Sequence, residues 1–241
     1  MNEAETRAEH IDPALKAAGW GVVDGSRVLR EHGITPGRLQ GGGGRGARTR
    51  AEIADYVLVY RNTKLAVIEA KAWGKPHTEG VGQAKAYAAK LAVRHTYSTN
   101  GQAIYGIDMA TGAEGDVAAF PTPDELWHLT FAEANAWRDR FAAVPFEDRG
   151  GTWQGRYYQE IAINRTIQAV LEARKRVLLT MATGTGKTVV AFQICWKLWS
   201  SRWNRAGEHR RPRILYLADR NILVDDPMAK TFAPFGDARW K

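Results

Sequence analysis

The sequence predicts an α/β protein in two parts, and three observations along the chain support this fold class. Two runs rich in β-branched and aromatic residues, 54–60 and 65–71, flank the polar turn "RNTK" and predict a β-hairpin. An alanine-rich segment, 81–92, then predicts a helix. Further along, an apolar strand at 177–180 leads into a glycine loop and a helix beginning near Lys187, as in α/β nucleotide-binding units.

Length and composition set the limits of the prediction. The chain has 241 residues, of which 44% are hydrophobic and 25% charged, so it can form one large or two small globular domains and is not a disordered polymer. The single cysteine, Cys195, lies in an apolar stretch and cannot form an internal disulfide, which fits a reducing cytoplasm. The polar N-terminus does not resemble a signal peptide, and no apolar run reaches the ~18 residues of a membrane span. We therefore expect a soluble, cytoplasmic protein without a membrane partner.

The distribution of charge and of helix-breaking residues predicts a domain junction near residue 150. Pro145 and the pair Gly150 and Gly151 close a helix-like segment, which divides the chain into 1–150 and 151–241. The first part has 18 basic and 19 acidic residues, a net charge of −1, whereas the second has 16 and 7, a net charge of +9. The second part is therefore the candidate for binding a polyanion.

Two basic segments leave alternatives open. The densest patch either binds a polyanion or is a solvated loop, and it consists of Arg202, Arg205, Arg210, Arg211 and Arg213. The glycine-rich stretch 40–50 either touches phosphates or is a plain surface loop, and its basic residues are Arg45, Arg48 and Arg50.

The hairpin brings together a candidate metal site. With the turn centred near Asn62, Asp55 lies opposite Glu69, and strand alternation places Lys71 on the same face as Glu69. Two facing carboxylates repel each other unless a cation lies between them, and Mg²⁺ favours such ligands, with the carbonyl of Ala70 as a further candidate. Lys71 is then placed to orient the attacking water or to offset charge in the transition state. On spacing alone, a charged strand end without metal remains the alternative.

Two polar residues on the predicted helix 81–92 are a further candidate pair. Gln83 and Tyr87 are four residues apart and share one helix face. They either hold the scissile strand beside the metal or belong to an ordinary helix surface.

The glycine loop carries the most specific motif. The strict phosphate-loop pattern requires glycine at position 181, where this chain has Met181, but the rest of the pattern is intact: Gly184, Gly186, Lys187 and Thr188. Loop N–H groups and the helix N-terminus can cradle the β-phosphate, while Lys187 reaches the β and γ oxygens and Thr188 holds Mg²⁺. The motif therefore predicts ATP and Mg²⁺ as cofactors.

The stretch "ATGTGKT" resembles motif I of superfamily 2 helicases, which accounts for Met181 and adds Thr183 and Thr185 to the candidate nucleotide-binding residues. The stretch "RYYQEIAI" resembles the adenine-recognising Q motif of the same superfamily. This resemblance implies that Gln159 reads the adenine edge and that Arg156 lies nearby.

The ordered set of motifs resembles the N-terminal part of the motor and cleavage subunit of type I restriction enzymes. In chain order these motifs are "ETRAEHIDPALKAAGW", "ADYVLVY…EAK", "YSTNG", "FPTPDELW", "RYYQ", "MATGTGKT" and "LADRNILVD". The resemblance implies a PD-(D/E)xK nuclease domain at 1–150, a mixed sheet flanked by helices, and the beginning of a RecA-like parallel-sheet domain at 151–241. It assigns the catalytic roles to Asp55, Glu69, Lys71, Gln83 and Tyr87.

The same resemblance implies a reaction and partners. We expect Mg²⁺-dependent cleavage of double-stranded DNA coupled to ATP hydrolysis, in a complex with modification (methyltransferase) and specificity subunits. Because the chain ends at Lys241 without a D-E-x-x box, we expect the ATPase to be incomplete here and residues 170–241 to be poorly soluble or poorly ordered alone. The alternatives are a helicase-nuclease of DNA repair or another defence system, and an inactive DNA-binding fragment.

Some positions depart from the family pattern. Ala54 replaces the proline of the motif name, and Asp226 stands where glutamine is expected. Either Glu5 or Glu9, on a first helix that Pro13 bends or restarts, is a candidate for an additional acid at the metal site. Ile11 and Leu15 of that helix are expected to point inward.

Overall fold

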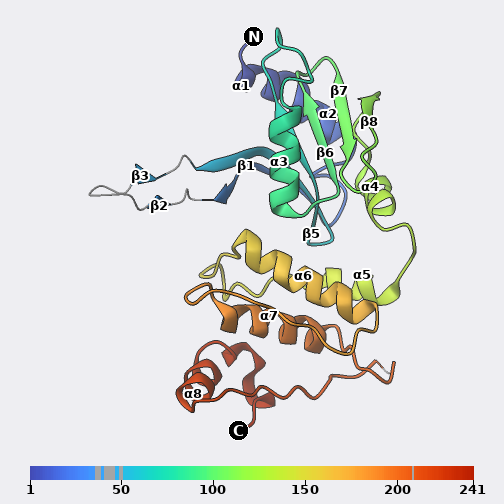
Figure 1. Ribbon diagram of the computed structural model, residues 1–241. Coiled ribbons are helices and arrows are strands. Elements are labelled where there is room, and N and C mark those ends of the chain that lie inside the picture. The colour runs from blue at the N-terminus through green and yellow to red at the C-terminus, as the bar shows by residue number, and fades with distance from the viewer. Residues whose placement is uncertain (36–38, 41–46, 49–50, 208) are drawn as a thin grey trace. The chain divides into compact units, whose positions relative to one another are not determined.

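The computed structural model of the chain describes residues 1–35, 39–40, 47–48, 51–207 and 209–241 (Figure 1). Its contacts divide it into two compact units, Met1–Ala134 and Asn135–Lys241. We predicted a junction near residue 150, but the helix preceding that point packs with the helices that follow it and so belongs to the second unit. Arg45 and Arg50 lie outside the described residues, and so does the side chain of Arg48. Within the described residues, no helix has the length and apolar character needed to cross a membrane.

The first unit is built on a six-stranded mixed sheet with the order β1-β4-β5-β6-β7-β8. Neighbouring strands are antiparallel except β5 and β6, which run parallel because a helical crossover connects them. The predicted mixed sheet flanked by helices is confirmed. Its strands are β1 (Ser26–Thr35), β4 (Glu52–Tyr60), β5 (Thr63–Ala70), β6 (His95–Thr99), β7 (Ile104–Asp108) and β8 (Glu114–Val117), and a separate pair consists of β2 (Leu39–Gln40) and β3 (Ala47–Arg48).

The predicted hairpin is formed by β4 and β5. Its two-residue turn, Arg61 and Asn62, has φ values of 49° and 56°, as the tight turns that match strand twist require. Strand β5 therefore begins at Thr63, earlier than predicted. Towards the far end of the hairpin the register places Asp55 opposite Glu69, as predicted, because the last ladder pairs are Tyr56 with Ile68, Val57 with Val67 and Leu58 with Ala66.

Helices cover this sheet. The N-terminal helix consists of α1 (Glu3–Thr6), a π-helical turn (Arg7–Ile11) and α2 (Asp12–Ala17). Pro13 lies in the first turn of α2, and the backbone stays helical at Ile11 and Asp12 before it, so the helix does not restart at Pro13. Ile11 and Leu15 are each 1% exposed, which confirms their predicted inward direction. Helix α3 (Val81–Leu91) packs against β5 and β6 (Figure 1).

Helix α4 (Pro123–Thr130) closes the first unit. Its N-terminus carries a capping box in which Thr122 accepts from the N–H of Glu125 and the Glu125 side chain accepts from the N–H of Thr122. The buried residues Leu126 and Trp127 form its inner face. Helix α4 is therefore fixed by local sequence signals.

The second unit is helical within the described residues. Its elements are α5 (Ala136–Ala143), α6 (Tyr157–Leu171), α7 (Lys187–Ser200), α8 (Ile222–Ala229) and a 3₁₀ segment (Ala233–Ala238). Phe141, Ile163, Ile167 and Val190 form a buried cluster that joins α5, α6 and α7. Lys197 of α7 donates to the carbonyl of Phe141 at 3.0 Å, which explains why α5 belongs to this unit.

The predicted strands of the second unit are not observed. Residues 177–180 and 213–219 have no strand ladder in the described part of this unit, so the expected parallel sheet is absent from it. Leu178 is 90% exposed and Leu215 is 81% exposed. The physical reason is that such apolar runs become strands only when another strand pairs with at least one of their edges, and these runs have no paired neighbour among the described residues.

Candidate active site

Asp55 is held from two sides, by the neighbouring strand β5 and by the N-terminal helix. It lies on β4, next to Tyr56, which forms the ladder pair with Ile68 at this end of the hairpin. Its side chain is 15% exposed. Its Oδ2 accepts a hydrogen bond from the N–H of Ala70 at 2.8 Å, and its Oδ1 faces Nη1 of Arg7 at 3.5 Å. The backbone bond fixes the carboxylate against the end of β5, where the other predicted residues lie.

Glu69 is the buried acid of the site, with 3% exposure. Its Oε1 accepts from Nζ of Lys71 at 2.9 Å, whereas its Oε2 is buried without a hydrogen-bond partner. Burial and then the charge of Asp55 raise the pKa of Glu69 to about 7, although Lys71 acts in the opposite direction. Burial lowers the pKa of Lys71, but the hydrogen bond and charge of Glu69 outweigh it, so this amine stays protonated. The site therefore contains a buried carboxylate with one oxygen that lacks a hydrogen-bond partner among the described residues.

These features fit a divalent cation. An unpartnered buried carboxylate oxygen is costly, and a cation beside Glu69 and Asp55 would relieve both the burial and the repulsion. The described residues contain no group of three or more His, Cys, Asp or Glu side chains suited to hold a metal. Two carboxylates completed by carbonyl, water or phosphate oxygens suit Mg²⁺, which retains several waters in proteins.

Gly80 provides the space that this arrangement needs. A Cβ atom at Gly80 would lie 2.7 Å from Oγ of Ser98, 2.8 Å from Cγ of Glu69 and 3.1 Å from Cε of Lys71. Its φ of −83° is open to any residue, so the requirement for glycine is steric. Gly80 is the N-cap of α3, so this close approach places the start of α3 against the side chains of Glu69 and Lys71.

Gln83 and Tyr87 share a face of α3 as predicted. Nε2 of Gln83 donates to the hydroxyl of Tyr87 at 3.0 Å. Gln83 is exposed and Tyr87 is 9% exposed. The described contacts join the two side chains to each other rather than to Asp55 or Glu69, so their role at the metal stays a prediction.

The N-terminal helix contributes acids, but in a different way from our prediction. Glu5 accepts from the N–H of Asn2 in a capping box, which ties it to the helix end. It is the charge of Glu3 that adds to the raised pKa values of Glu69 and Lys71. The structure describes no such effect from Glu9.

The glycine loop has the backbone that its motif predicts. Gly184 and Gly186 have φ values of 77° and 81°, in the left-handed region that favours glycine. Helix α7 begins at Lys187, as predicted, and Nζ of Lys187 donates to the carbonyl of Met181 at 3.3 Å. Thr188 follows in the first turn, so Lys187 and Thr188 lie beside a helix N-terminus, where anions bind readily.

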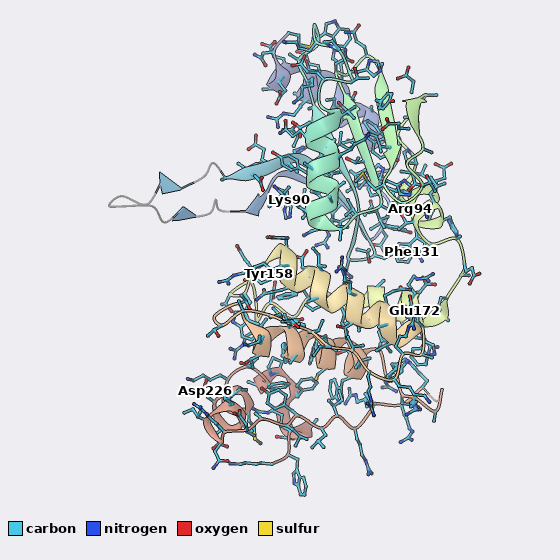
Figure 2. The ribbon with its side chains drawn as sticks, viewed as in Figure 1. Lys90, Arg94, Phe131, Tyr158, Glu172 and Asp226 are labelled. Carbon is cyan, nitrogen blue, oxygen red and sulfur yellow. The ribbon has the colours of Figure 1, made fainter. Side chains whose placement is uncertain are left out.

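Gln159 is 5% exposed and contacts the loop directly. Its Nε2 donates to the carbonyl of Thr185 at 2.8 Å, and its Oε1 accepts from the N–H of Arg156 at 3.1 Å. A Cβ atom at Gly186 would clash with Nε2 of Gln159. Arg156 donates to the hydroxyl of Tyr158, labelled on α6 in Figure 2. Both ends of the Gln159 amide are thus bonded to backbone.

Two further predicted positions lie in the second unit. Asp226, labelled in Figure 2, lies on α8 and pairs with Lys230. In the basic patch, the guanidinium of Arg211 lies 3.8 Å from the ring centroid of Trp199.

The structure adds three residues that sequence reasoning missed: Arg7, Gly80 and Glu3. Of the three, only Gly80 has a local signal in the sequence, because it directly precedes the predicted helix 81–92. Arg7 lies within the first quoted motif, but neither Arg7 nor Glu3 signalled which residues it meets, because their partners are distant in the sequence.

Comparisons with known proteins show what the chain is similar to. Residues 152–240 match the family described as "Type III restriction enzyme, res subunit". The chain is 38% identical, over its whole length, to the type I restriction enzyme EcoAI endonuclease subunit of Escherichia coli. A solved fragment described as an HsdR subunit of a type I restriction enzyme from Vibrio vulnificus YJ016 matches all of this chain with a TM-score of 0.80 and 45% identity. The chain is a homologue of type I restriction HsdR subunits. This confirms the resemblance inferred from the motifs.

The HsdR relatives are longer than this chain. It spans 30% of the EcoAI subunit and 44% of the Vibrio fragment. The EcoKI endonuclease subunit of E. coli strain K12 is 34% identical over 106 residues, which is 44% of this chain and 8% of that subunit.

Proposed function

We propose that this HsdR homologue contains a PD-(D/E)xK nuclease site in its first unit and the nucleotide-binding loop of a RecA-like motor in its second. The observation that supports the nuclease site is the convergence of Asp55, Glu69 and Lys71, with one Glu69 oxygen buried and unpartnered. The proposed substrate is double-stranded DNA. By homology, the proposed complex also contains the modification and specificity subunits of a type I restriction system.

In the nuclease site, Asp55 and Glu69 would hold Mg²⁺. When bound, this ion supplies charge neutralisation at the phosphate and a more acidic water. The Lys71 ammonium, ion-paired with Glu69, places a positive charge where the phosphate accumulates negative charge during attack. Gly80, having no Cβ atom, leaves room for the side chains of Glu69 and Lys71. The hydrogen bond from Gln83 to the hydroxyl of Tyr87 orients the face of α3 that we assign to the scissile strand.

In the nucleotide site, the loop residues would bind ATP with Mg²⁺. Lys187 and Thr188 at the start of α7 are placed for the phosphates and the ion, and Thr183 and Thr185 complete the loop. For Gln159 to read adenine, assisted by Arg156, its amide must exchange its backbone partners for the base edge.

The test is Mg²⁺ binding by calorimetry together with nicking of supercoiled DNA, using the 241-residue chain and its Glu69→Gln variant. We expect the variant to lose both activities. Glu114→Gln, which removes an exposed carboxylate from the edge strand β8, is the matched control and should retain both. Absence of Mg²⁺ binding by the unaltered chain would contradict the nuclease proposal, as would unchanged binding by Glu69→Gln.

A further inference from the structure

Arg7 bridges two acids on neighbouring strands. It is the first residue of the π-helical turn, and its side chain is 21% exposed. Its Nη1 lies 3.5 Å from Oδ1 of Asp55, and its Nη2 lies 3.2 Å from Oε1 of Glu31. The guanidinium is therefore shared between β4, which carries a candidate metal ligand, and β1 beside it.

Glu31 interrupts the pairing of β1 with β4. Strand β1 pairs with β4 through Arg30 with Tyr56 and His32 with Ala54, and Glu31 between them is absent from the ladder. Its φ is 49°, in the left-handed region that costs a non-glycine residue about 1–3 kcal/mol. Such strain persists only where the surroundings maintain it, and it occurs here at the strand position across from Asp55.

Three acids thus occupy matching positions on β1, β4 and β5: Glu31, Asp55 and Glu69. Two cationic side chains, Lys71 and Arg7, form ion pairs with these acids. Lys71 contacts Glu69 at 2.9 Å, a normal length for a charged hydrogen bond, whereas Arg7 contacts Asp55 at 3.5 Å, which is clearly longer. The Arg7 contact is consequently the weaker one and the easier one to exchange.

The two oxygens of Asp55 have different partners. Oδ2 is bonded to the N–H of Ala70, so Oδ1 is the oxygen that a metal ion and Arg7 would have to share. A guanidinium displaced from a carboxylate has a fork of N–H donors that fits a phosphate equally well. Glu31, with 69% of its side chain exposed, holds the other amino group of the Arg7 guanidinium at 3.2 Å.

We propose that Arg7 is a substrate-binding residue that competes with the divalent cation for Asp55 and, once displaced, binds a phosphate of the DNA backbone. Glu31 is the positioning residue that holds Arg7 beside the site. This inference rests on the proposed nuclease function.

The test uses Arg7→Gln in the 241-residue chain, with two readouts that change in opposite directions. Mg²⁺ affinity by calorimetry should increase by about threefold to tenfold, because a competing positive charge is removed. Binding of a short DNA duplex in Ca²⁺, another cation with oxygen ligands, should weaken, and its salt dependence should decrease by about one ion. In EDTA the variant and the unaltered chain should bind the duplex within about twofold of each other.

Two further variants complete the test. Arg30→Gln removes an equally charged but 62% exposed neighbour paired with Asp12, and both readouts should stay unchanged. Glu31→Gln should weaken Mg²⁺ binding, opposite to Arg7→Gln, because Arg7 is then left with Asp55 alone. It tests the proposal even if Arg7→Gln does not fold.

Weaker or unchanged Mg²⁺ binding in Arg7→Gln would overturn the inference. An unchanged salt dependence of duplex binding in Ca²⁺ would also overturn it. So would a change of Mg²⁺ affinity in the same direction in Arg7→Gln and Glu31→Gln. Glu69→Gln is measured in parallel. If it loses Mg²⁺ binding while Arg7→Gln behaves like the unaltered chain, only the role of Arg7 fails. If the unaltered chain binds no Mg²⁺, the nuclease proposal fails as well.

Discussion

The buried Glu69 carboxylate should reduce the stability of the first unit, so its neutral isostere should stabilise this unit at high pH. The pKa of Glu69 is raised from 4.5 to about 7, and a tenfold change in proton affinity is worth about 1.4 kcal/mol. The upper bound of the cost is therefore about 3 kcal/mol. Because Lys71 loses part of its ion pair in Glu69→Gln, we expect a net gain of about 1–3 kcal/mol.

The sign follows from the direction of the shift. The folded state binds the Glu69 proton more tightly than the unfolded state, so stability declines as pH rises from about 4.5 to about 7 and the full cost is present above that window. Glu69→Gln should match the unaltered chain near pH 4 and exceed it at pH 8. The trade-off is the loss of the metal ligand.

The assay must report on the first unit alone, because a chain of two units need not unfold in one step. Hydrogen exchange of the β4 and β5 amides, measured at pH 5 and pH 8 with correction for intrinsic rates, provides this local free energy. Glu114→Gln is the control and should change little at either pH. Equal destabilisation by Glu69→Gln at both pH values would refute the reasoning.

Three further predictions concern the same sites. Mg²⁺ affinity should fall by up to about tenfold for each pH unit below 7, because protons compete for Glu69, and calorimetry in buffers of different ionisation enthalpy should detect proton release. Gly80→Ala should cost about 1–3 kcal/mol in chemical denaturation and weaken Mg²⁺ binding, whereas Gly82→Ala, with open space around it, should be neutral or stabilising. Gly186→Ala combines a left-handed φ with a clash at Gln159 and should abolish binding of a fluorescent ATP analogue; retained affinity would contradict the assigned loop.

Local patterns predicted several elements correctly. The hairpin register followed from alternating β-branched runs around a short turn, and it placed Asp55 opposite Glu69. The start of α7 at Lys187 followed from a glycine loop that cannot itself continue a helix. Each of these signals acts between residues close in the chain.

The strands predicted at 177–180 and 213–219 failed for the opposite reason. Their apolar runs satisfy strand propensity, but a strand forms only through pairing with other segments, and propensity alone does not provide a partner. The boundary between the two compact units also depends on a contact between residues that are distant in the sequence. Lys197 bonds to the carbonyl of Phe141, 56 residues away, and thereby keeps α5 with the second unit.

The sequence by itself predicted the hairpin with its acids and lysine and the glycine loop, because these depend on short-range periodicity and spacing. Its motifs, through their resemblance to type I restriction subunits, indicated the homology to HsdR. Only the tertiary structure showed that Arg7 reaches Asp55, 48 residues away, and that Gly80 packs against Glu69. It also showed the burial that raises the pKa of Glu69. Desolvation and steric fit arise from atoms that meet after folding, and they decide whether a carboxylate pair can bind a metal ion.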